Sequence, residues 1–193
     1  MPNATVGHGL AQSPEMIIAK QRDVADLWLA LTDRIDGSVD YLALNTAAAK
    51  ADYATGAFTS STFTNPYAAS SDVIAYCFHS VEGYSKIGSY TGNGSIDGPF
   101  VYTGFRPAFV LMKDTGSPEQ WQIVDSARDT YNVVDSALFP ALSNIEGTNA
   151  NIYRDFLSNG FKVRTSDTSQ NASGRTYIYM AFAEMPFKYA NAR

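Results

Sequence analysis

The chain has one cysteine and two histidines among its 193 residues, so it carries few of the side chains that bind transition metals. A single cysteine excludes an internal disulfide. One cysteine and two isolated histidines also cannot supply the four ligands of a structural zinc site. We therefore expect neither a metal nor another cofactor.

Charged residues are scarce too, at 17% of the chain, against roughly 25% in an ordinary soluble domain. The net charge of −5 disfavours a nucleic-acid partner, because binding to phosphates needs a basic face. No apolar run approaches the ~20 residues of a membrane span. The first residues, MPNATVGHGL, lack the basic start and apolar stretch of a signal peptide. We expect no nucleic acid and no membrane insertion.

Hydrophobic residues make up 45% of the chain and aromatic residues 13%, which favours a buried core built from strands. Helix signals are few. The alanine-rich segment 45–54, NTAAAKADYA, is the better candidate for a short helix, because alanine and lysine are good helix formers. Segment 23–35, DVADLWLALTDRI, fits a helix or a strand. We favour a strand, because the matching later segment contains Pro118 and reads WQIVDS.

The sequence repeats itself. SPEMIIAK (13–20) resembles RPAFVLMK (106–113), and the two tryptophans, Trp28 and Trp121, share the same offset of 93. VIAYCF (73–78) matches YIYMAF (177–182) at an offset of 104, and EGYSK (82–86) then matches EMPFK (184–188). Chance rarely places so many residue types at common spacings, so we infer a duplicated unit of about a hundred residues.

Each unit has the pattern of an all-β fold. Short apolar runs bounded by proline and polar residues are typical of strands buried between two layers. GFKVRTS (160–166) alternates strictly, and Asn159–Gly160 before it predicts a hairpin turn. We expect two tandem sandwich- or jelly-roll-like units with little helix, residues 1–84 and 85–193. The first lacks its leading strand, because SKIGSYTGNGS (85–95) has no counterpart before VGHGL.

No motif predicts catalysis. Cys77 aligns with Ala181 and is best explained as a small core residue rather than a nucleophile. His8 and His79 lie outside any recognisable catalytic motif, and GNGSIDG (92–98) is not followed by the Lys-Ser/Thr of a phosphate loop. We expect no catalytic residues and no enzyme.

Several tyrosines lie in or beside expected turns. Tyrosine presents a flat amphipathic face at small entropic cost, which suits sugar stacking and protein interfaces. The candidate ligand-binding residues are Tyr84, Tyr90, Tyr102 and Tyr153. The alternative is that they only pack along the ends of the sandwich.

Three long stretches carry a resemblance: GYSKIGSYTGNGSIDGPFVYTGFRPAFVLMK (83–113), DFLSNGFKVRTS (155–166) and NASGRTYIYMAFAEMPFKYANAR (171–193). They resemble the repeated β domain of tail-fibre-like structural proteins from bacteriophages of marine and cyanobacterial hosts, often found next to concanavalin-like domains. The resemblance implies a non-enzymatic virion protein, made in the host cytoplasm and placed on the virion exterior. It would act in host-surface attachment or virion assembly, with other virion proteins and a host-surface glycan as expected partners.

Other functions stay open at this point. The chain could be a carbohydrate-binding, lectin-like module or a capsid decoration protein, and a surface depolymerase is a more distant alternative. The resemblance assigns no role to any single residue.

The last residues repeat the phrase that opens the second unit. Segment 187–193, FKYANAR, would be an opening strand with no unit after it, while the first unit lacks such a strand. An unpaired edge favours pairing with any available strand. We therefore expect this segment to pack against the first unit of its own chain or of a neighbour, with Phe187, Tyr189 and Arg193 at the interface. Pairing between chains would give a closed homo-oligomer, with a trimer favoured by family analogy.

Overall fold

The structure is a computed structural model, and it describes residues 4–148 and 150–185. Antiparallel strands dominate, and the two helices are a single turn each, so the expected all-β fold with little helix is confirmed. The strands are β1 (Thr5–Gly7), β2 (Met16–Gln21), β3 (Trp28–Thr32), β4 (Asp40–Ala43), β5 (Ala51–Asp52), β6 (Thr62–Thr64), β7 (Val73–Phe78), β8 (Ser85–Thr91), β9 (Phe100–Tyr102), β10 (Pro107–Asp114), β11 (Gln122–Asp125), β12 (Ser136–Ala137), β13 (Gly147–Thr148), β14 (Arg154–Leu157), β15 (Gly160–Val163) and β16 (Thr176–Ala183). The helices are η1 (Ala150–Ile152) and α1 (Thr168–Asn171).

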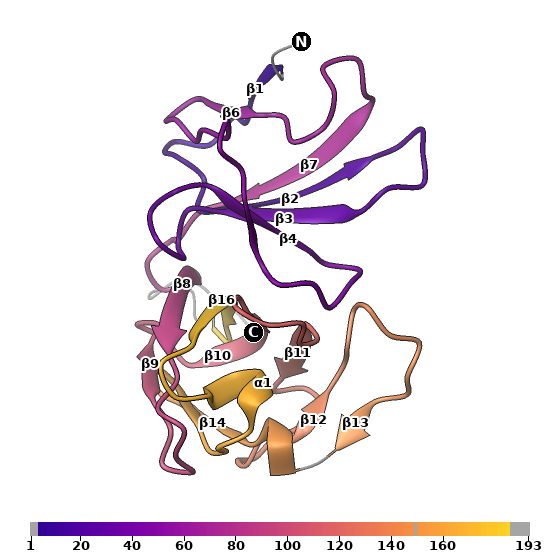
Figure 1. Ribbon diagram of the computed structural model, residues 1–193. Helices are drawn as coiled ribbons and strands as arrows, with labels where there is room; N and C mark the ends of the chain where they lie inside the picture. The colour runs from indigo at the N-terminus through magenta and orange to yellow at the C-terminus, as the bar shows by residue number, and fades with distance from the viewer. Residues whose placement is uncertain (1–3, 149, 186–193) are drawn as a thin grey trace.

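The strands form layers, which Figure 1 shows from the side. The two-stranded ribbon β1–β6 covers a five-stranded sheet of order β5-β4-β3-β2-β7. The other face of that sheet packs on a four-stranded sheet of order β11-β10-β16-β8, and a three-stranded sheet, β14-β15-β9, covers the far side. Three hydrophobic clusters fill the spaces between these layers, as expected when every sheet must bury an apolar face.

The duplication is visible in the strand registers. In the five-stranded sheet, Ile17 lies opposite Leu31 on one side and Cys77 on the other. In the four-stranded sheet, Val110 lies opposite Val124 and Ala181. Val110 and Val124 correspond to Ile17 and Leu31 at the offset of 93, and Ala181 corresponds to Cys77 at the offset of 104. Because a slip of one residue would turn every side chain to the other face, equal registers show that both units fold by the same pattern.

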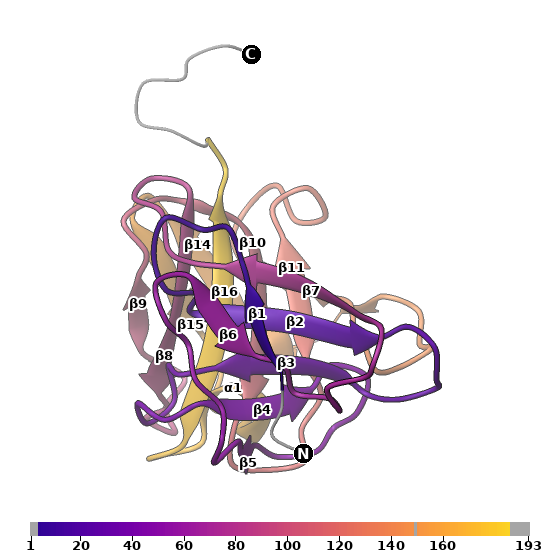
Figure 2. The same ribbon diagram turned by 90° about the horizontal axis from the view of Figure 1, so that it is seen from above.

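The two central sheets share one core. Figure 2 shows the strands of the five-stranded sheet running across those of the four-stranded sheet behind it. Trp121 is fully buried between them, and its indole Nε1 donates a hydrogen bond to the carbonyl of Ala43 at 2.9 Å. Leu42 from the first half and Met180 from the second pack into the same cluster. The division into domains 1–84 and 85–193 stays a prediction.

The units differ at the edge of the closing strand. β16 lies between β10 and β8, with Lys86 opposite Ala181 and Tyr90 opposite Tyr177. The corresponding strand β7 pairs with β2 on one side, and no strand covers its other edge within residues 4–148 and 150–185.

Two local expectations need correction. Segment 45–54 is not helical: it runs through a turn into β5, because the amide of Lys50 donates to the carbonyl of Thr115 at 2.8 Å and its side chain binds three carboxylates. Segment 23–35 does hold the strand β3, as favoured. The hairpin turn is Ser158–Asn159, because Gly160 already pairs with Leu157 in the ladder.

Candidate binding site at the open edge of β7

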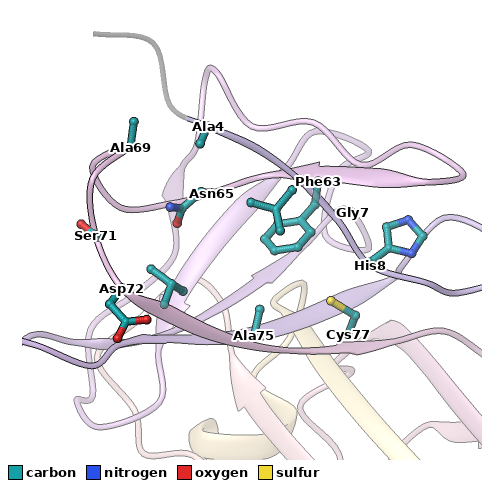
Figure 3. Close-up of a pocket in the computed structure, with 12 residues that line it drawn as sticks. Ala4, Gly7, His8, Phe63, Asn65, Ala69, Ser71, Asp72, Ala75 and Cys77 are labelled. Carbon is teal, nitrogen blue, oxygen red and sulfur yellow. The ribbon is translucent and has the colours of Figure 1, made fainter.

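A groove of about 500 Å³ lies between the β1–β6 ribbon and the open edge of β7. Figure 3 shows that its walls come from β1, β6, β7 and the loop that leads into β7. The lining residues are Ala4, Val6, Gly7, His8, Phe63, Asn65, Ala69, Ser71, Asp72, Val73, Ala75 and Cys77.

Small side chains on β7 produce this space. Its groove-facing residues are Val73, Ala75 and Cys77. At an offset of 104, β16 carries Tyr177 and Tyr179 at the first two of these positions. Both tyrosines are fully or almost fully buried in the core of the second unit.

The strand β8 completes the filling in the second unit. The ring of Tyr90 stacks on Tyr177 with centroids 5.1 Å apart, meets Phe161 edge-on, and its hydroxyl donates to the carbonyl of Gln170 at 2.8 Å. The groove in the first unit therefore corresponds to the volume that Tyr90 and the tyrosines of β16 occupy in the second.

The backbone of β7 presents hydrogen-bonding groups to the groove side. The amide of Arg22 donates to the carbonyl of Asp72 at 2.8 Å at the start of the β2–β7 ladder. Since bonding alternates along an antiparallel pair, the amides and carbonyls of Val73, Ala75 and Cys77 point away from β2. A row of unpaired groups along an edge is a template for another strand.

The other face of β7 is partly exposed as well. Ile74 and Tyr76 have exposed fractions of 39% and 46%, although the corresponding residues of β16, Ile178 and Met180, are buried. The open edge therefore leaves apolar surface uncovered on both faces of the strand.

Both ring nitrogens of His8 in the groove are already engaged. The Nδ1 atom of His8 accepts from the amide of Leu10 at 3.0 Å, and its Nε2 lies 3.1 Å from the carbonyl of Thr59. Burial raises the pKa of the Cys77 thiol, which keeps it protonated near neutral pH. Cys77 therefore offers no thiolate, and His8 offers no free general base. Cys77 packs against the core, as the sequence predicts. The geometry suits binding.

The four predicted tyrosines do not come together. Tyr90 was expected near the surface, and that expectation is wrong: its side chain is 9% exposed and belongs to the core described above. The reason is that β8 is a strand, paired along its whole length with β16, rather than part of a turn.

The other three candidates lie on separate segments of the chain. Tyr84 is 37% exposed and its ring meets Phe182 edge-on, with centroids 5.7 Å apart. Tyr102 on β9 is 64% exposed, and Tyr153, just before β14, is half-buried. Ligand binding by these residues stays a prediction. The predicted interface residues Phe187, Tyr189 and Arg193 lie outside the described part of the chain.

One group of carboxylates could be mistaken for a metal site. Ligand oxygens of Asp36, Asp40 and Asp52 lie within 4.8 Å of one another. The ammonium of Lys50 sits among them, at 2.7 Å from Asp36, 2.9 Å from Asp40 and 3.2 Å from Asp52. The hydrogen bond from Lys50, followed by those from Ser38, lowers the pKa of Asp36, because these contacts favour its charged form. Lys50 supplies the positive charge, and we assign no metal here.

The groove is the feature that sequence reasoning missed. Its signal is the exchange of large for small residues between matched positions, Tyr177 for Val73 and Tyr179 for Ala75. That exchange indicates an unfilled volume only once β7 and β16 are known to face equivalent layers in the two units.

Among the described residues, no helix has the length and apolar character needed to cross a membrane. No curated protein and no solved structure matches the chain. The chain does match the family described as Domain of unknown function (DUF7483), over residues 2–186. This match covers nearly the whole chain, and the protein belongs to that family.

Proposed function

We propose that this protein is a non-enzymatic structural component of the exterior of a bacteriophage particle, a tail fibre or similar part, that binds another protein chain along the open edge of β7. The observation that carries the proposal is the contrast between the two units: β8 fills the edge of β16, and the matched edge of β7 is open beside a groove.

Strand addition needs two things that this edge offers. Outward amides and carbonyls give affinity, and pockets for alternate side chains give specificity. Here the outward amides and carbonyls of Val73, Ala75 and Cys77 supply the hydrogen-bonding groups, and the groove beside them supplies the pocket for side chains. The virion context is supported by the sequence resemblance to the repeated domains of phage structural proteins.

Glycan binding receives less support from the groove. Sugar recognition needs free polar groups beside an exposed ring. However, Asp72 is paired with Arg22 at 3.1 Å, His8 is bound on both nitrogens, and the ring of Phe63 is only 3% exposed. Saturable binding of the isolated protein to surface glycans of plausible hosts would favour the lectin-like alternative.

The test uses purified particles. Mass spectrometry and electron microscopy with a labelled antibody should find the protein on the outside of mature virions. A bulky thiol reagent should modify Cys77 in the isolated chain at low concentration and fail to modify it in intact virions. Absence of the protein from mature virions would contradict the proposed location, and equal modification in both samples would contradict binding at the edge.

A further inference from the structure

We infer that a pocket between the β7–β8 connection and the β9–β10 connection binds a hexuronate, a sugar residue that carries a carboxylate on its ring. The pocket has a volume of about 320 Å³ and shares no lining residue with the groove beside β7. The inference therefore goes beyond the proposed strand addition and does not rest on it. The lining residues are Ser80, Glu82, Gly83, Ser85, Lys86, Tyr102, Thr103 and Gly104.

Two connections of the chain bring these residues together. Residues 79–84 link β7 to β8, and residues 103–106 link β9 to β10. β8 and β9 lie side by side in Figures 1 and 2, so both connections border the same space. Side chains alternate along a strand, and Lys86 therefore lies on the same face of β8 as Tyr90, toward the three-stranded sheet that contains β9.

An exposed aromatic ring belongs to this pocket. Tyr102 is 64% exposed, although it lies in the strand β9. Gly104 is beside its ring: a Cβ built on this glycine would be 3.6 Å from the hydroxyl oxygen of Tyr102 and 3.9 Å from its Cε1 and Cζ atoms. A ring that contacts the chain here and stays largely exposed offers a flat apolar surface with a polar tip, on which the C–H face of a sugar ring can stack.

Two charged groups of the pocket have no partner in the described part of the chain. Lys86 is half-buried and Glu82 is exposed, and neither takes part in an ion pair or a side-chain hydrogen bond there. The serine and threonine hydroxyls of the pocket, in contrast, all donate hydrogen bonds within the chain. These hydroxyls belong to Ser80, Ser85 and Thr103. One cation and one anion thus remain free beside an exposed ring.

These groups match the chemistry of a hexuronate. An ammonium binds a carboxylate through charge-assisted hydrogen bonds, and a carboxylate accepts hydrogen bonds from hydroxyl groups. A hexuronate carries its carboxylate and its hydroxyls on one ring. Lys86 can therefore bind the carboxylate, Glu82 the hydroxyls, and Tyr102 the ring itself.

The same groups disfavour other ligands. A neutral sugar would leave Lys86 without a counter-charge, and Glu82 would repel a ligand with several neighbouring carboxylates, such as an acidic peptide. Pockets for small molecules have volumes of about 300 to 1,000 Å³, so this pocket is at the lower end and suits a small ring better than a long segment.

The test is a titration of the isotopically labelled full chain with trimers of galacturonic, glucuronic and mannuronic acid, followed by nuclear magnetic resonance. At least one trimer should bind saturably and shift the amide signals of Gly83 and Gly104. The matching neutral trimer, of galactose, glucose or mannose, should bind about fivefold more weakly or worse, because it lacks the carboxylate. Absence of saturable binding by all three acidic trimers would overturn the inference.

Substitutions separate the two contacts. Lys86→Met removes the charge and should weaken binding about fivefold or more, with loss of the preference for the acidic trimer. Tyr102→Ala should weaken binding as well, whereas Tyr102→Phe keeps the ring and should retain it. The matched controls Lys20→Met and Tyr131→Ala remove a half-buried lysine and an exposed tyrosine outside the pocket, and affinity should not change. An unchanged preference for the acidic trimer in Lys86→Met would overturn the assignment.

The titration also distinguishes this pocket from the groove. Signal shifts confined to Val73, Ala75 and Cys77 would overturn this inference and favour the lectin-like alternative at the groove. Shifts confined to the pocket support the inference and leave the proposed strand addition unaffected, because the two sites share no residue.

Discussion

Gly160 is a glycine because another strand passes where its side chain would lie. A Cβ built on this residue would be 2.1 Å from the carbonyl oxygen of Val101 on the neighbouring strand β9. We expect Gly160→Ala to lower the free energy of unfolding by more than about 2 kcal/mol, because the β9–β15 pairing must shift. Gly116→Ala is the control: its nearest neighbour would be 3.7 Å away, and the change should stay within about 0.5 kcal/mol in chemical denaturation.

Lys113 gives a pH dependence with a definite sign. Its ammonium is buried and donates to the carbonyls of Asp114 at 2.7 Å and Ser117 at 3.0 Å, without an ion-pair partner among the described residues. Burial lowers its pKa from 10.5 to about 8. Between these values the unfolded chain binds more protons than the folded one, so stability rises with pH in this window.

The measurement compares wild type with Lys113→Met at each pH, so that other titrating groups cancel. The difference in free energy of unfolding, wild type minus variant, should rise by about 2 kcal/mol from pH 8 to pH 10. A flat difference across this range would show that Lys113 is not held in a low-pKa environment.

At the scale of the element, β7 differs from β16 in its smaller groove-facing side chains and in its second edge, which no strand covers among the described residues. Ala75→Pro removes an amide that points to the open edge and none that bonds β2, and proline is tolerated at such positions of edge strands. We expect the variant to keep its circular dichroism spectrum and to lose the association expected of wild type in sedimentation. Tyr76→Pro, which removes an inward amide, should instead destabilise the fold. Association unchanged by Ala75→Pro would contradict a role for this edge.

The sequence could predict the strands that are continuous apolar runs. The runs at Ile17 and Val110 identify buried strands, and their matched offsets already imply matched registers. The helix expected over 45–54 was wrong because helix propensity is worth tenths of a kcal/mol per residue. That preference is outweighed by the three carboxylates around Lys50.

The groove could not be predicted, because it depends on a difference in volume between two layers. Val73 and Ala75 are ordinary strand residues by themselves. Only the structure shows that they face the space filled by Tyr177 and Tyr90 in the other unit.

At the scale of the whole molecule, the two units are joined by the core between the central sheets. Trp121 is fully buried there, whereas the matched Trp28 is half-buried. We expect Trp121→Ala to lower the free energy of unfolding by about 3–5 kcal/mol, because it leaves a cavity and an unpaired carbonyl at Ala43. Trp28→Ala should cost less than half as much.

The same variant tests whether the units unfold together. In Trp121→Ala the remaining tryptophan, Trp28, reports on the first unit, and far-ultraviolet circular dichroism reports on both. The two signals should give one midpoint in urea, since the core is shared. Separate midpoints would show that the units are independent.

The occupation of the β7 edge is tested most directly by amide hydrogen exchange in intact virions and in the isolated protein at low concentration. The amides of Val73, Ala75 and Cys77 point outward, and those of Ile74 and Tyr76 bond β2. In intact virions we predict slow exchange at all five. In the isolated protein the three outward amides should exchange at least tenfold faster while the two inward ones stay protected. Equally fast exchange of the outward amides in both samples would contradict the account.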